Sequence, residues 1–172
     1  MKVITFYADP PNSTYYSDHA QKWVDNVKSF ELDYYIEELN GDDGYWKNTR
    51  KKPQFILNCM NKFQDTILWV DIDDVIIAKP EPLNCDIAFQ LFPNDYHHIR
   101  SRNKIAASGL TFNYTQKSLN FLKEWTKRCE NYKGKPKGDH DIIFGVIKDI
   151  DFKKEYYKNN FIIHGQSNGR ND

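Results

Sequence analysis

Three aspartates, Asp71, Asp73 and Asp74, stand within four positions directly after the apolar run of residues 67–70. β-Branched, aromatic and aliphatic residues fill this run without alternation, which is typical of a buried strand. Unpaired carboxylates are costly to bury, so we expect the strand to end here and to open onto something cationic. If the backbone turns at this point, Asp71 and Asp73 can converge on one hard cation, and oxygen ligands suit Mn²⁺ or Mg²⁺. A solvated turn at the end of a strand is the alternative interpretation.

A second polar cluster, Asp139-His140-Asp141, comes directly before the apolar residues 142–144. This order predicts a helix that begins near Asp139, with either aspartate able to cap the first turn. If that helix N-terminus faces a cavity, the same side chains could take part in a proton transfer. Capping and catalysis both stay open from the pattern alone.

The C-terminal residues carry a third set of candidate groups. His164 follows the strand-like residues 161–163, and a neutral imidazole is a good third ligand for a divalent metal held by two carboxylates. Arg170 offers a forked donor that matches phosphate. A frayed C-terminus is the alternative. His97 and His98 show no comparable partner spacing, and we expect them on a loop surface.

Basic residues at positions 50–52 precede Pro53, a residue that is favoured at the first position of a helix. Cations at a helix N-terminus oppose the helix dipole, and a nearby anionic ligand would explain them. A solvated helix start is the alternative. Gly109, inside the strand-like residues 105–113, predicts a bulge or a close approach of the backbone to a ligand.

The composition favours one domain that spans residues 1–172. With 24 basic and 24 acidic residues the net charge is +0, so we expect neither nucleic acid nor a membrane surface as a partner. The three cysteines show no C-x-x-C spacing, which favours reduced core thiols. We find no signal-peptide pattern and no apolar run of about 18 residues, so we expect a cytoplasmic protein without a membrane span.

Strand patterns alternate with helix patterns along the chain, which indicates an α/β sheet with helices on both faces. The expected strands cover residues 2–7, 33–39, 67–70, 75–78, 85–92, 105–113 and 161–163. The expected helices cover residues 17–30, with Ser17 as the N-cap, and 115–128, and two more begin near positions 53 and 139.

In this order the motifs resemble those of small GT-A-type glycosyltransferases. The resemblance runs through nearly the whole chain. Its first elements are an N-terminal strand with Phe6 and Tyr7, the Lys-Pro-x-Phe-Ile segment at 52–56 and the Asp-x-Asp strand at 68–73. Ser108-Gly109, Trp125 in a helix, the Asp-x-Asp helix start at 139–141 and His164-Gly165 follow. It implies a single Rossmann-like domain with a mixed, mainly parallel central sheet flanked by helices. It also implies transfer of a sugar from a nucleotide-diphosphate sugar, by family habit a UDP-sugar, to a glycan or other hydroxyl acceptor.

The resemblance assigns roles to individual residues. Mn²⁺ or Mg²⁺ would be held by Asp71, Asp73 and His164. The nucleotide would lie near Tyr7, Asp9, Lys52, Asp71 and Arg170. The donor sugar and the acceptor would face Asp139, His140 and Asp141, with Asp141 or Asp139 as the base of an inverting enzyme.

Some features depart from the family pattern and keep other interpretations open. His140 stands where related retaining enzymes often have Gln, and the chain lacks a Lys-Pro-Trp ending, so it could be a short enzyme or one domain of a larger glycosyltransferase. Asp71-Ile-Asp73-Asp74-Val75 also fits the nucleophile loop of haloacid-dehalogenase-like phosphatases, with Asp71 as nucleophile and Asp73 as acid. That loop normally follows the first strand of its domain, whereas 70 residues precede Asp71. A non-catalytic nucleotide-sugar-binding domain is the third hypothesis.

Overall fold

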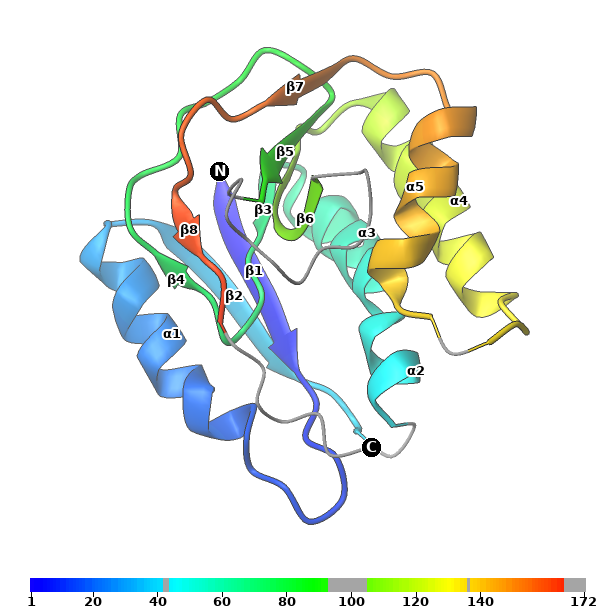
Figure 1. Cartoon of the computed structure of the whole chain (residues 1–172). Helices are drawn as coiled ribbons and strands as arrows, with labels where there is room; N and C mark the ends of the chain where they lie inside the picture. Colours follow the sequence, from blue (N-terminus) through cyan, green and yellow to red (C-terminus); the bar gives the residue numbers. More distant parts are fainter. Residues whose placement is uncertain (42–43, 93–104, 136, 166–172) are drawn as a thin grey trace.

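A six-stranded mixed sheet in the order β2-β1-β3-β6-β5-β7 forms the centre of the molecule (Figure 1). The computed structural model describes residues 1–41, 44–92, 105–135 and 137–165. The strands are β1 (Lys2–Tyr7), β2 (Asp33–Glu38), β3 (Ile67–Trp69), β5 (Ile87–Leu91), β6 (Ile105–Phe112) and β7 (Lys154–Tyr156). β1 is parallel to β2 and β3, β5 is parallel to β7, and β6 is antiparallel to both of its neighbours. The predicted α/β architecture with a mixed, mainly parallel sheet is confirmed.

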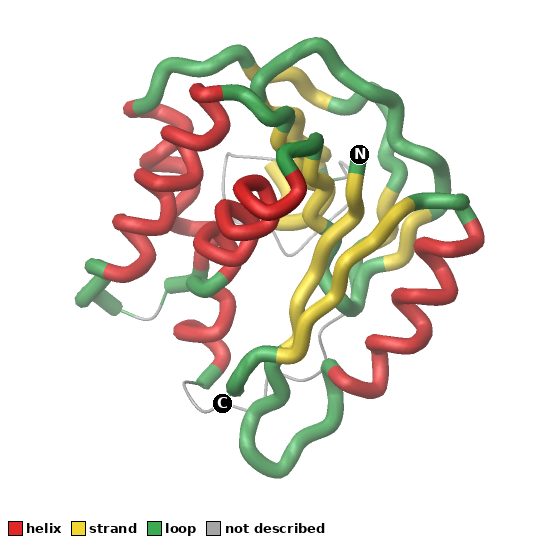
Figure 2. The backbone as a smooth tube through the Cα atoms, turned by 180° about the vertical axis from the view of Figure 1, so that it is seen from behind, coloured by secondary structure: helices red, strands yellow, loops and turns green. Residues whose placement is uncertain are grey.

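Helices cover both faces of the sheet, as the view from behind also shows (Figure 2). α1 (Ser17–Ser29) lies on one face, and α3 (Lys52–Phe63), α4 (Gln116–Glu130) and α5 (Asp139–Asp149) lie on the other. The short helix α2 (Tyr45–Thr49) precedes α3. The chain crosses from β1 to β2 through α1 and returns to β3 through α3. β1 and β3 are therefore the neighbouring strands at which the direction of winding reverses.

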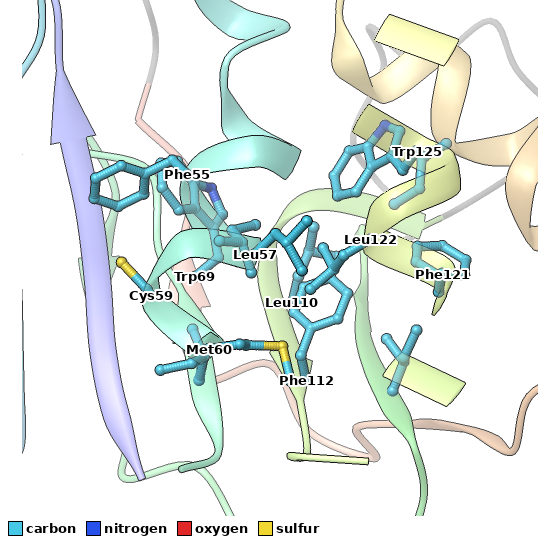
Figure 3. Packing of buried hydrophobic residues seen from close by; sticks show 14 of the residues in the cluster. Phe55, Leu57, Cys59, Met60, Trp69, Leu110, Phe112, Phe121, Leu122 and Trp125 are labelled. Atoms are coloured by element: carbon cyan, nitrogen blue, oxygen red, sulfur yellow. The ribbon is translucent and has the colours of Figure 1, made fainter. Parts of the chain in front are cut away.

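Two apolar cores follow from the alternation of side chains along the strands. Ile4 and Trp69 belong to the core under α3, α4 and α5, whereas Val3 and Leu68 belong to the core under α1. Figure 3 shows the first core, where side chains of α3 and α4 meet those of β3 and β6. Both faces of the central strands are thus buried, which explains their continuous apolar sequences.

A two-stranded antiparallel ribbon brings the end of the described chain to the end of β3. β4 (Val75–Ile76) pairs with β8 (Ile162–Ile163), with Val75 opposite Ile163. His164 follows this pairing at once, so it lies beside the aspartates that precede Val75. The ribbon therefore joins the aspartate turn to His164, although the two are far apart in the sequence.

The N-termini of α4 and α1 are capped in different ways. The Thr115 side chain accepts a hydrogen bond from the Ser118 amide and caps α4. Ser17, which we predicted as the N-cap of α1, is instead the first helical residue. The capping oxygens come from Asp9, whose carboxylate accepts from the amides of Tyr16 (2.8 Å) and Ser17 (3.2 Å). The prediction of Ser17 as the N-cap was wrong because a side chain from the preceding loop fills the role.

The bulge that Gly109 predicted is present. The pairing of β5 with β6 shifts register between Phe89 and Leu91, and Gly109 has a φ of +71°, a conformation that L side chains rarely adopt. The irregular part of β6 contains Ala107 and Ser108, both of which line the cavity described below. The sequence patterns did not predict α2 or β7, and His97 and His98 lie outside the described residues.

Candidate functional site

A cavity of about 420 Å³ opens at the carboxyl ends of β1 and β3. In an open α/β sheet, ligands bind where the winding direction reverses, outside the carboxyl ends of the strands. The walls come from the end of β1, the residues that follow β3, the bulge of β6, helix α2, the N-terminus of α5 and the segment after β8. Each predicted cluster that falls within the described residues therefore contributes to one cavity.

Asp71 is held firmly at the rim of this cavity. The indole Nε1 of Trp69 donates to its Oδ1 at 2.7 Å, and its own amide donates to the Ser108 hydroxyl at 2.9 Å. The Asp74 amide donates to the Asp71 carbonyl at 3.1 Å, which closes a tight turn over the four residues. The predicted turn of the backbone after the strand is present, and it is anchored on the bulge of β6.

Lys52 is a buried cation that joins three elements. Its Nζ lies 3.0 Å from Asp71 Oδ1 and 3.0 Å from Asp139 Oδ2, and it donates to the Ala107 carbonyl at 3.1 Å. The side chain is 6% exposed. Burial alone would lower the pKa of Lys52, but the carboxylates of Asp139 and Asp71 raise it above its usual value. Lys52 therefore stays charged, and its ammonium lies within 3.1 Å of three protein oxygens.

The carboxyl group of Asp73 is crowded by the other two carboxylates of the turn. Burial, with the negative charges of Asp71 and Asp74, raises its pKa to about 6. Among the residues that the structure describes, its carboxylate has no hydrogen bond or ion pair to another side chain. The rings of Tyr15 and Tyr16 lie close enough for the charge of Asp73 to raise the pKa of both phenols, after burial as the main cause. A bound cation would relieve this crowding.

Asp74 and His164 form a buried pair. His164 Nδ1 lies 3.1 Å from Asp74 Oδ2, and the Gly165 amide donates to Asp74 Oδ1 at 2.8 Å. Burial would lower the pKa of His164, but the hydrogen bond and charge of Asp74 raise it. A side chain at position 165 would overlap the carbonyl oxygen of Asp73, so the close approach of the two segments requires glycine.

Gln90 fixes the other side of the His164 ring. Its Oε1 accepts from the amides of Phe161 (3.1 Å) and Ile162 (3.2 Å), so its Nε2 is the donor group. That Nε2 donates to the Ile162 carbonyl at 3.1 Å and lies 3.3 Å from His164 Nε2. Gln90 is fully buried in β5 and thus holds β8 and the imidazole together.

The three residues at the start of α5 have different environments. Asp139 is 3% exposed and faces Lys52, while Trp125 donates to its backbone carbonyl at 3.2 Å. His140 Nε2 lies 2.8 Å from the Ile105 carbonyl, so this nitrogen is the donor. Asp141 is exposed on the first turn and lines the cavity. Asp141 is the carboxylate of this cluster that faces solvent in the cavity.

The residues predicted to bind the nucleotide are only partly brought together. Tyr7 lines the cavity at the end of β1, and its hydroxyl donates to Glu38 Oε2 at 3.2 Å. Lys52 and Asp71 also line it, whereas Asp9 caps α1 from outside the lining. Arg170 lies outside the described residues.

The predicted metal ligands are close together but are not arranged as a completed metal site. Within the described part of the chain, no group of three or more His, Cys, Asp or Glu side chains is placed to hold a metal ion. Asp71 and Asp73 fit a divalent cation by their chemistry and by the raised pKa of Asp73. His164 is turned toward Asp74 and Gln90, so its role as a ligand stays a prediction.

Several residues that build the site had no role assigned to them from the sequence. Ser108, Gln90 and Trp69 orient the aspartates and the histidine, and Tyr16 and Trp46 line the cavity. One signal was present for Gln90, because an uncharged polar side chain inside the apolar run 87–91 needs a buried partner. Ser108 stands next to Gly109, and a bulge often re-aims neighbouring side chains toward a site.

Comparisons with known proteins identify the fold. No protein-family model and no curated protein matches the sequence. A crystal structure of a glycosyltransferase involved in the glycosylation of the major capsid of PBCV-1 matches with a TM-score of 0.63 at 13% identity, over 91% of this chain and 80% of that chain. The catalytic domain of Drosophila β1,4-galactosyltransferase 7 in complex with xylobiose matches with a TM-score of 0.55 at 14% identity.

A mutant of the same Drosophila enzyme, in complex with manganese, UDP-Gal and xylobiose, matches with a TM-score of 0.52 at 14% identity. Both Drosophila structures cover 92% of this chain, which spans 66% of theirs. The chain therefore has the GT-A fold of glycosyltransferases. None of the helices in the described ranges is both long enough and apolar enough to span a membrane.

Proposed function

We propose that this protein is a metal-dependent glycosyltransferase that moves a sugar from a nucleotide-diphosphate sugar to a glycan or other hydroxyl acceptor. A UDP-sugar is the proposed donor. The observation that carries the proposal is the charge of the cavity, whose described lining includes five aspartates and one lysine. Lys52 is already engaged by Asp71 and Asp139. A diphosphate would be repelled from such a cavity unless a divalent cation entered with it.

The carboxylates of Asp71 and Asp73 are the groups that would hold Mn²⁺ or Mg²⁺. When bound, such a cation neutralises the charge that develops on the diphosphate as the glycosidic bond breaks. Asp74 orients the His164 ring through Nδ1, as carboxylates orient metal-binding histidines in many proteins. If His164 serves as the third ligand, its Nε2 must exchange the contact with Gln90 for the metal.

An acceptor hydroxyl needs a group that takes its proton. Asp141 is the proposed base, because it is exposed in the cavity on the first turn of α5. Asp139 is less suited, because it is buried and faces the Lys52 ammonium. Asp139 instead positions Lys52, which in turn holds Asp71 in place.

The donor's nucleoside is proposed to lie against the wall formed by Tyr7, Tyr16 and the end of β1. Aromatic rings in a cavity of this size provide stacking surfaces for a base, and a few polar groups fix its orientation. The related Drosophila structure contains manganese, UDP-Gal and xylobiose, which supports this class of ligands for the shared fold.

Calorimetric titration of UDP and GDP, each with and without Mn²⁺, tests the proposal on the wild type and on Asp73→Asn. We expect binding that requires Mn²⁺ and is lost in Asp73→Asn, and the preferred base will follow from the two nucleotides. Asp25→Asn, an exposed position on α1, is the matched control and should bind as the wild type does. If neither nucleotide binds under any condition, the glycosyltransferase proposal is wrong.

Two further assays separate the other hypotheses. Release of nucleotide from a UDP-sugar without acceptor distinguishes an enzyme from a pure nucleotide-sugar-binding domain, which should release none. Hydrolysis of an aryl phosphate that is lost in Asp71→Asn would favour the haloacid-dehalogenase-like phosphatase.

A further inference from the structure

Helix α2 is a shared wall between the site cavity and a second hollow. Tyr45 and Trp46 line both, and their rings pack edge to face with centroids 5.1 Å apart. The second hollow has a volume of about 330 Å³. The two hollows therefore adjoin at these two aromatic rings.

Among the described residues, the sign of the charge changes across α2. The site cavity is lined by five aspartates, whereas the charged residues described around the second hollow are Lys47, Arg50 and Lys133. Arg50 is held in place by the carbonyl oxygens of Trp46 and Tyr132, and its guanidinium lies 5.6 Å from the Tyr132 ring centroid. Lys47 and Lys133 are exposed.

A larger groove of about 570 Å³ continues this surface between β2, α3 and α4. It shares Lys47, Arg50 and Tyr132 with the second hollow. It adds Lys51 and Lys62, and the Lys62 ammonium lies 4.1 Å from the Tyr35 ring centroid, although Glu37 and Glu130 also line it.

We infer that the acceptor is an acidic saccharide, whose reacting sugar enters the site cavity and whose carboxylate or sulfate groups lie along the cations beyond α2. This inference rests on the proposed function. Aromatic rings pack against the apolar faces of sugar rings, and lysine and arginine pair with anionic substituents. Because the site cavity is acidic, the reacting sugar itself should be neutral. A nucleic acid, which is charged at every residue, fits this change of sign poorly.

Binding of defined pentasaccharides tests the inference. The probes are chondroitin pentasaccharide with N-acetylgalactosamine at its non-reducing end, the same pentasaccharide 4-sulfated only on its other N-acetylgalactosamine residues, and neutral chitopentaose. We expect the two acidic probes to bind more tightly than chitopentaose, with affinity that falls as salt rises. The tighter of the two identifies carboxylate or sulfate as the preferred group. In Lys47→Glu/Lys133→Glu the acidic probes should bind about tenfold more weakly, as expected for the loss of a charge-assisted contact.

Lys22→Glu/Lys79→Glu is the control, because it changes the net charge by the same amount at exposed positions outside the three hollows. It should leave saccharide binding unchanged. Titration of UDP with Mn²⁺ on the same proteins reports folding and the donor site separately. If UDP binds but chitopentaose binds as tightly as the acidic probes, or no saccharide binds, the inference is overturned and the proposed function stands. If the acidic probes bind through Lys47 and Lys133 while no nucleotide binds, the cationic groove is supported and glycosyl transfer is not.

Discussion

Replacement of Lys52 by methionine tests the electrostatic framework of the site most directly. The side chain of methionine has a similar length, so the change removes the charge and the three donors with little loss of packing volume. Lys52 currently lies 3.0 Å from Asp71 Oδ1, 3.0 Å from Asp139 Oδ2 and 3.1 Å from the Ala107 carbonyl. The substitution leaves Asp139 as a buried carboxylate without a cation.

The expected loss of stability follows from burial. The side chains of Lys52 and Asp139 are 6% and 5% exposed, and removal of one partner of a buried pair costs about 3–5 kcal/mol. Asp71 is 32% exposed, so solvent screens its interaction with Lys52, and losing that interaction adds little to the total loss of stability. For a domain of this size the loss corresponds to a decrease in Tm of roughly 6–20 °C.

Urea unfolding followed by tryptophan fluorescence measures this loss at pH 7 and at lower pH. Burial raises the pKa of Asp139 even beside Lys52, and without Lys52 it will rise further above the unfolded value. A raised carboxyl pKa costs stability above the unfolded pKa, and this cost disappears as pH falls through the folded pKa. The difference between Lys52→Met and the wild type should therefore shrink as the solution is acidified.

Two comparison variants make the result specific. Lys52→Met/Asp139→Asn removes the orphaned charge and should recover part of the lost stability at pH 7. Lys62→Met removes an exposed lysine of the same helix and should change the free energy of unfolding by less than about 1 kcal/mol. If Lys52→Met costs no more than Lys62→Met, or its cost does not depend on pH, Lys52 is not a buried counter-ion and the reasoning fails.

The remaining predictions concern the turn and its neighbours. Because the pKa of Asp73 is raised to about 6, its charged form costs stability above the unfolded pKa, so Asp73→Asn should stabilise the protein at pH 7 in EDTA. This gain in the free energy of unfolding should vanish as pH falls through about 6 toward 4. A gain in stability that does not depend on pH would contradict the raised pKa of Asp73. Gly165→Ala should displace the segment after β8, because the new methyl overlaps the Asp73 carbonyl, and should weaken Mn²⁺-dependent nucleotide binding without unfolding the sheet. Gln90→Leu removes the hydrogen-bond acceptor of the Phe161 and Ile162 amides, and each unpaired amide should cost about 1–3 kcal/mol of stability. Hydrogen exchange at these two amides should therefore accelerate more than at the amides of β3.

The elements that the sequence predicted well are those with a strong apolar pattern. β1 matches its predicted residues 2–7, and α4 and α5 begin within one residue of the predicted positions. These elements are buried on at least one face, so their apolar residues repeat with the period of the helix or strand. β7 was missed because its three residues are all exposed, and α2 because five residues hold little more than one helical turn.

The position of the site was also accessible from the sequence, because acids cannot continue a buried strand. What the pattern could not provide was the partner of each acid. Asp73 and Asp74 are adjacent, and His164 is 90 positions beyond Asp74 in the chain. The pairing of Val75 with Ile163 decides which carboxylate meets the imidazole, and that register is a tertiary property.

The resulting division of charge explains how three adjacent carboxylates coexist at the end of a buried strand. Lys52 and Trp69 stabilise Asp71, and His164 and the Gly165 amide offset part of the cost of burying Asp74, whose pKa burial still raises. Asp73 stands between them without a comparable partner in the described residues, and burial, with the charges of both neighbours, raises its pKa. On the proposed function, the charge of Asp73 is the one that a divalent cation would compensate. A cation that enters the cavity gains most from Asp73, which is why Asp73→Asn should both stabilise the empty protein and abolish metal-dependent binding.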